Sequence, residues 1–116
     1  MREAGTSRLL IPRVIRAAGP IGRAVGLLGR SSMSDEEAMW FDSCASIHTL
    51  GMRMAIDVLF LDKGATVIAL VSPARPWRPW IGARGACTVV ELANGACARV
   101  GIETGMRLEV QWDSLT

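Results

Sequence analysis

Several residue types are scarce in this sequence of 116 residues: it has no tyrosine, one histidine, one lysine and three cysteines. The cysteine count is odd and no Cys-x-x-Cys pair occurs, which argues against a disulfide framework and against a structural zinc site. We therefore expect no bound metal, and no motif indicates a cofactor. No run approaches the roughly twenty apolar residues that a membrane-spanning helix needs, so we expect no membrane insertion.

The N-terminal part of the chain has no uninterrupted apolar segment, because Arg8, Arg13 and Arg16 interrupt it. A signal peptide needs such a segment, so the cytoplasm is the expected location, although a signal peptide that had been removed would leave no trace. The net charge of +2 is too small to indicate nucleic-acid binding. The length suits a single β-rich domain, expected at residues 8–116 and preceded by a disordered tail at residues 1–7.

Residues 53–61 form the longest strand-like pattern in the chain, because apolar residues occupy both alternating faces over most of its length. A strand with one solvated face would alternate cleanly, so this pattern predicts a central strand that is buried on both faces. Asp57 is the exception within it. A carboxylate near a core must be hydrogen-bonded, paired with a cation or protonated. The favoured interpretation is structural: Asp57 bonds neighbouring backbone amides or an arginine.

Proline, glycine and apolar spacing predict the remaining elements. Pro20 and Gly29 mark the beginning and the end of a short helix, and Gly64 is expected to supply a positive φ in a tight hairpin turn. We predict a mainly β (α+β) fold, a compact small barrel or sandwich of about six mostly antiparallel strands with two short helices. The expected strands span residues 9–15, 39–41, 54–61, 66–72, 86–92 and 106–112, and the expected helices span residues 20–28 and 96–100.

Cys44, His48 and Asp57 are candidate catalytic residues, because a histidine can activate a thiol that it touches and a carboxylate can orient the ring. Closeness in sequence does not establish contact, and a buried cysteine is commonly inert. Asp57 and Glu91 form a second candidate pair, since two carboxyl groups on neighbouring strands can act as acid and base. The favoured alternative is that Glu91 points to solvent, which strand alternation alone explains.

Residues 73–80 form the most distinctive loop, in which proline recurs at every third position and favours an extended polyproline conformation. Arg75, Trp77, Arg78 and Trp80 stand between or beside these prolines. Tryptophan and arginine dominate binding hot spots, and they can stack on a sugar ring or a nucleobase or engage a partner protein. An equally weighted alternative is that one or both tryptophans fold back over the core, since exposing their large apolar area is costly.

Six short motifs follow one another along residues 14–110. They are Gly-Leu-Leu-Gly-Arg at 26–30, Met-Trp-Phe at 39–41, the central signature at 46–49, 52–53 and 56–62, Pro-Trp-Arg at 76–78, Val-Glu-Leu-Ala-Asn-Gly at 90–95, and Gly-Ile-Glu-Thr-Gly at 101–105. In this order they resemble an uncharacterised bacterial and archaeal family, domain of unknown function 192 (DUF192). The resemblance implies a small, mostly β domain with short helices and implies no established activity. Asn94 and Met106 depart from the family pattern, which usually has proline or alanine at the first position and often aspartate at the second.

These observations predict a binding or accessory module with its surface at the mouth of the barrel. The expected partner is a small molecule, anionic or sugar-like, or another protein. The alternatives are a small enzyme using the Cys44–His48 or Asp57–Glu91 pair, and a structural subunit of a larger assembly. The expected ligand-binding residues are His48, Thr49, Met52, Asp57, Trp77 and Arg78.

Overall fold

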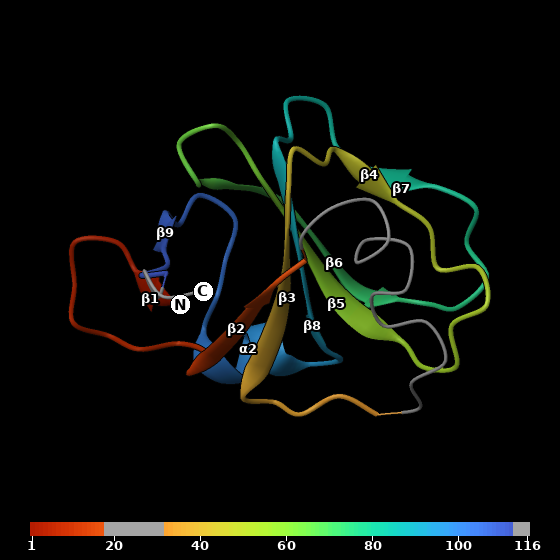
Figure 1. Cartoon of the computed structure of the whole chain (residues 1–116), viewed down its shortest axis with the longest axis horizontal. Helices are drawn as coiled ribbons and strands as arrows, with labels where there is room; N and C mark the ends of the chain where they lie inside the picture. Colours follow the sequence, from red (N-terminus) through yellow and green to blue (C-terminus); the bar gives the residue numbers. More distant parts are fainter. Residues whose placement is uncertain (18–31, 113–116) are drawn as a thin grey trace.

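A computed structural model describes residues 1–17 and 32–112 of the chain. Its fold is built on an open sheet of five strands (Figure 1). In sheet order the strands are β2 (Arg13–Arg16), β3 (Glu37–Asp42), β8 (Thr88–Ala93), β5 (Ile56–Leu61) and β6 (Val67–Ala74). Strand β2 is parallel to β3, and the other three pairings are antiparallel, as the sequence predicted for most of the sheet. Strands β2 and β6 are the edges, so within the described part of the chain the sheet does not close into a barrel.

Strand β5 is buried along its whole length, which confirms the predicted central strand. Ile56, Val58 and Phe60 pack into one hydrophobic cluster, and Leu59 and Leu61 pack into a second cluster. The two clusters lie on opposite faces of the sheet because alternate side chains of a strand point in opposite directions. Full burial of side chains of this size contributes about 1.5–3 kcal/mol each, so the sheet is stabilised from both faces.

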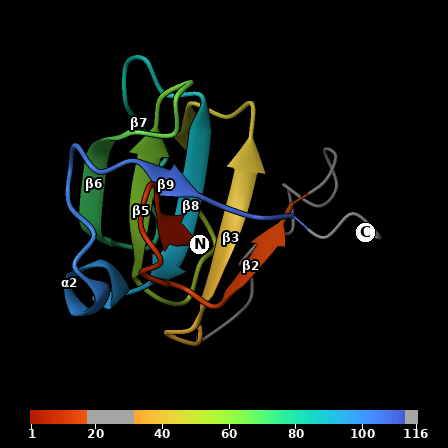
Figure 2. The same cartoon turned by 90° about the vertical axis from the view of Figure 1, so that its left-hand side faces the viewer.

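Two short ribbons and one helix complete the described fold: β1 (Arg2–Glu3) with β9 (Leu108–Glu109), β4 (Ser46–Ile47) with β7 (Ile81–Gly82), and α2 (Ala96–Val100). Leu108 of β9 packs into the cluster of Leu59, and Ile81 of β7 packs into the cluster of Phe60, so the ribbons cover opposite faces of the sheet (Figures 1 and 2). Gly101 caps α2 with a left-handed φ of 79°, as its position in the sequence predicted.

The β5–β6 hairpin confirms the pairing that the sequence predicted, but its turn differs in one detail. The positive φ belongs to Ala65, at 63°, and not to Gly64. The carboxylate of Asp62 accepts hydrogen bonds from the backbone N–H groups of Gly64 at 2.8 Å and Thr66 at 3.0 Å. The side chain of Asp62 therefore organises the turn, and the left-handed conformation falls one residue later than expected.

Other expectations require correction. The segment predicted to be a disordered tail contains β1, because the side chain of Met1 is buried in the core and Arg2–Glu3 pair with β9. The strand expected at residues 106–112 is reduced to Leu108–Glu109. The described residues form nine strands and one helix, and the helix predicted at residues 20–28 lies outside them. Within the described ranges, no helix has the length and apolar character needed to cross a membrane.

Candidate functional site

Thr49 joins the two loops that carry the predicted binding residues. Its backbone N–H donates to the carbonyl of Arg78 at 2.9 Å, and its carbonyl accepts from the N–H of Trp77 at 2.8 Å. Its hydroxyl donates to the carbonyl of Arg75 at 2.6 Å and accepts from the N–H of Arg78 at 2.9 Å. Thr49 is fully buried, so these hydrogen bonds hold the two loops together where water cannot compete for them.

Trp77 and Arg78 are exposed directly beside this buried link, and His48 is exposed on the opposite loop. The side chain of Trp77 is 69% exposed, although tryptophan usually buries most of its area. Its φ of 66° lies in the left-handed region, which side chains of this size rarely adopt, and the bonds to Thr49 hold the backbone there. No described residue forms a hydrogen bond or an ion pair with the guanidinium of Arg78.

Cys44 and His48 face different partners and are not hydrogen-bonded to each other. The buried thiol of Cys44 lies 3.1 Å from the carbonyl of Ser46, to which it donates. The Nδ1 atom of the exposed His48 ring accepts from the N–H of Leu50 at 3.2 Å. Activation of a thiol requires contact with its base, so this arrangement gives no support to thiol catalysis.

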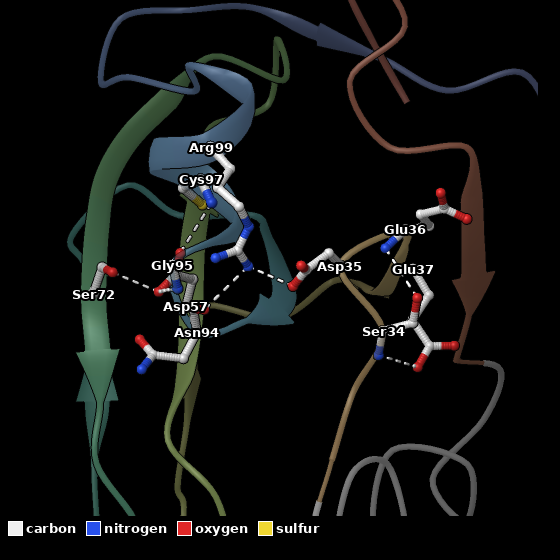
Figure 3. A network of polar contacts seen from close by, with 10 residues as sticks. All are labelled: Ser34, Asp35, Glu36, Glu37, Asp57, Ser72, Asn94, Gly95, Cys97 and Arg99. Carbon is white, nitrogen blue, oxygen red and sulfur yellow. Dashed lines mark hydrogen bonds and ion pairs between the residues drawn. The ribbon is translucent and has the colours of Figure 1, made fainter.

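Asp57 lies in β5 and points to the sheet face that α2 covers. Its carboxylate accepts hydrogen bonds from the backbone N–H groups of Gly95 and Cys97, both at 3.0 Å, and from the hydroxyl of Ser72 (Figure 3). The structural interpretation of Asp57 is therefore confirmed, because the carboxylate bonds backbone amides. Met52 is also buried, so neither of these two predicted ligand contacts reaches the exposed surface.

The thiol of Cys97 is part of the same network. Burial raises its pKa to about 12, and the charge of Asp57 and a hydrogen bond with that carboxylate add to the effect. The guanidinium of Arg99 forms an ion pair with Asp35 and donates to the carbonyl of Asn94, which fixes the other side of α2 (Figure 3). A thiol with so high a pKa is a poor nucleophile at neutral pH, so this network is structural.

Glu91 is buried, with only 5% of its surface exposed, which corrects the interpretation that it points to solvent. It pairs across the sheet with Val58, whereas Asp57 pairs with Leu92. Paired residues share a face, so the two carboxyl groups lie on opposite faces and cannot work on one substrate as acid and base. Burial raises the pKa of Glu91 to about 7. Alternation misled the prediction because both faces of this sheet are covered.

Trp80 is an exposed residue whose part in this surface the sequence did not assign. It is 65% exposed, and its ring lies against Gly82 of β7. A Cβ atom at Gly82 would come within 2.5 Å of Cζ2 of the indole, so only glycine leaves room for the ring in this position. Leu50 adds exposed apolar surface on the neighbouring loop, at 41%.

In residues 1–17 and 32–112, no group of three or more His, Cys, Asp or Glu side chains is placed to hold a metal.

The fold and this surface define a class of protein: a small, mainly β domain that presents aromatic and basic side chains on two joined loops. The chain belongs to the DUF192 family, described as "Uncharacterized ACR", whose model matches residues 3–110. The predicted resemblance is therefore confirmed over nearly the whole chain.

Two relatives are UPF0127 proteins. The one from Pyrococcus furiosus is 42% identical over 65 residues, which cover 56% of this chain and 55% of that protein. The one from Thermococcus sibiricus is 38% identical over 69 residues, which cover 60% of this chain and 43% of that protein. The match thus spans about half the length of these relatives.

Two solved structures share the fold. A protein of unknown function from Novosphingobium aromaticivorans has a TM-score of 0.75 at 26% identity, covering 84% of this chain and 74% of that one. A protein from Sinorhizobium meliloti, described as a putative transcription regulator, has a TM-score of 0.75 at 28% identity, covering 83% of this chain and 79% of that one.

Proposed function

We propose that this protein is a binding module whose ligand surface consists of His48, Trp77 and Arg78, which the buried Thr49 holds in place. One observation carries the proposal: the buried Thr49 holds Trp77 in a left-handed conformation with its indole exposed, next to the Arg78 guanidinium, which pairs with no described residue. Rare backbone conformations that the surroundings hold in place cluster at functional sites. An indole that is 69% exposed leaves a large apolar area in water, which a bound ligand would cover.

The roles of these residues follow from their chemistry. Trp77 offers an apolar face for stacking, and Arg78 offers a planar cation that can pair with a carboxylate or a phosphate. His48 supplies a hydrogen-bonding ring at the edge of the surface, and Thr49 positions the two loops without contacting the ligand. A small anionic molecule, a sugar-like molecule or a protein fits this combination.

NMR titration of the ¹⁵N-labelled chain tests the proposal. Inorganic phosphate, citrate and glucose are added separately, and the backbone amide signals and the indole N–H signals of the tryptophans are followed. We expect at least one probe to shift the signals of Trp77, Arg78 and Thr49 in a saturable way, and we expect Trp77→Ala to abolish saturation. Trp112→Phe is the matched control, because the Trp112 ring packs edge-to-face against Trp40 of β3 and not against the two loops.

Saturable shifts confined to residues outside the two loops would contradict the proposal. So would an unchanged response in Trp77→Ala. If none of the probes shifts these signals, the small-molecule form of the proposal fails, and only the protein-binding form remains.

A further inference from the structure

The exposed surface extends beyond the residues of the proposed site to Trp80. The ring of Trp80 lies against Gly82 of β7. Gly82 pairs with Ser46 of β4, so Trp80 is next to the ribbon that joins the two loops. Trp77 and Trp80 are therefore two aromatic residues on one continuous segment, both more than half exposed.

The two segments that Thr49 joins, residues 43–56 and 72–87, carry positive charge and no negative charge. They contain no aspartate and no glutamate. Their arginines are exposed, and no described residue forms a hydrogen bond or an ion pair with any of their guanidinium groups. These arginines are Arg53, Arg75, Arg78 and Arg84. By contrast, Arg13, Arg16 and Arg99 elsewhere in the structure are each paired with a carboxylate.

We infer that residues 43–56 and 72–87 form a docking surface for an acidic segment of another protein, a short stretch rich in aspartate and glutamate. The inference rests on the proposed function and names its partner class. The unpaired guanidinium groups supply planar, bidentate partners for carboxylates. Trp77 and Trp80 supply fixed apolar contact for the segment's backbone and methylene groups, and tryptophan with arginine is the composition that dominates protein interfaces.

The charge distribution favours a short acidic segment over a long polyanion. The chain has a net charge of only +2, which is less than the charge of the four arginines, so the remainder of the molecule is slightly acidic in sum. DNA-binding proteins of high affinity make roughly six to ten phosphate contacts, more than this surface can supply.

Fluorescence anisotropy with a fluorescein-labelled synthetic peptide rich in glutamate and aspartate tests the inference. The matched peptide has glutamine and asparagine in place of every acid. We expect the acidic peptide to bind and the amide peptide to bind at least about tenfold more weakly, since charge pairing steers and holds the complex. Raising the salt concentration should weaken the binding of the acidic peptide alone.

Variants locate the binding. Arg75→Gln and Arg78→Gln are each expected to weaken binding of the acidic peptide about fivefold or more. Trp80→Ala and Gly82→Ala should weaken it similarly, the second by displacing the ring that the first removes. Arg107→Gln is the matched control: it removes an exposed arginine beside Thr66, outside the two segments, and should leave binding within about twofold of the parent chain.

The inference is overturned if the acidic peptide does not bind, or if Arg107→Gln weakens binding as much as Arg78→Gln. It is also overturned if single-stranded oligothymidylate, or vesicles of phosphatidylcholine with phosphatidylserine, bind more tightly than the peptide and with the same variant sensitivity. Saturable binding of citrate or glucose at Trp77 with no binding of the acidic peptide would leave the proposed function intact and end this inference alone.

Discussion

Asp57 and Glu91 are two carboxyl groups in neighbouring strands, both buried, and the protein treats them in opposite ways. Asp57 receives hydrogen bonds from Ser72, Gly95 and Cys97. Glu91, on the other face of the sheet, receives none from the described residues, and burial raises its pKa to about 7. The comparison shows that burial alone does not determine what a carboxyl group does. The number of donors that reach it decides whether it holds the fold together or opposes folding when ionised.

The largest expected effect comes from Asp57→Asn. The side chain keeps its shape but loses its charge, and its NH2 group replaces one carboxylate oxygen, so the backbone N–H donor facing that position lacks an acceptor. We expect the free energy of unfolding to fall by about 4 kcal/mol in urea denaturation. Asp62→Asn is the matched control, because Asp62 also accepts from two backbone N–H groups but lies partly exposed in a turn. Equal losses in the two variants would mean that burial adds nothing to the role of Asp57.

Glu91→Gln should change the pH dependence of stability. The folded-state pKa of about 7 lies above the usual 4.5, so the folded state binds a proton more tightly than the unfolded state. The contribution of Glu91 to stability is then greatest below pH 4.5 and is lost as the pH rises to about 7, by about 3 kcal/mol. The glutamine variant should lack this contribution.

The measurement is urea denaturation of the parent chain and of Glu91→Gln at pH 5 and at pH 8. Between pH 5 and pH 8, the free energy of unfolding should fall by about 3 kcal/mol more in the parent chain than in Glu91→Gln. If the two proteins lose stability in parallel between these pH values, Glu91 does not titrate in this range and the contrast with Asp57 disappears.

Ser72→Ala should have a smaller effect than either carboxyl substitution. It removes one of the donors to Asp57 and leaves the two backbone donors in place. We expect a loss of about 1–2 kcal/mol in the free energy of unfolding. In the Asp57→Asn background the same substitution should cost less, because the charged acceptor is already gone. Additive losses in the double variant would show that the hydroxyl does not act through Asp57.

The smallest expected effect concerns the reactivity of Cys97 and not the stability of the fold. The rate at which this thiol is alkylated reports on the Asp57 network. A pKa raised from 9.0 to about 12 lowers the thiolate fraction about a thousandfold at neutral pH. With iodoacetamide at pH 8, the exposed Cys87 should react while Cys97 remains unmodified, as peptide mass spectrometry would show. Modification of both thiols at similar rates would indicate that the network opens readily in the native state.

Much of the sheet could be predicted from the sequence because its strands follow simple patterns. Residues 53–61 are apolar on both alternating faces, and this alone identified β5 and its hairpin with β6. Whether the sheet closes into a barrel could not be predicted from these patterns, since closure depends on which strands meet at the edges. Strand β2 lies parallel to β3 at the end of the sheet, and no residue pattern within Arg13–Arg16 indicates that pairing.

The candidate site was predicted in part for the same reason. The proline spacing and the residue types of the loop at 73–80 identified Trp77 and Arg78 as unusual, and the structure brings them to Thr49. Met52 and Asp57 were also predicted to bind a ligand, but both are buried, in β5 or beside it. The position of the Trp80 ring against Gly82, two residues later, depends on side-chain conformation, which the sequence pattern does not show.

The position of β8 has a consequence for folding during synthesis. This strand lies between β3 and β5, although it follows both of them in the chain (Figure 1). As the chain leaves the ribosome, β5 and β6 can pair as soon as residue 74 has emerged. Strand β3 must wait for residues 88–93 before it gains its antiparallel neighbour. Until then the apolar edges of β3 and β5 are both open, so the nascent chain is most exposed to aggregation just before residues 88–93 emerge.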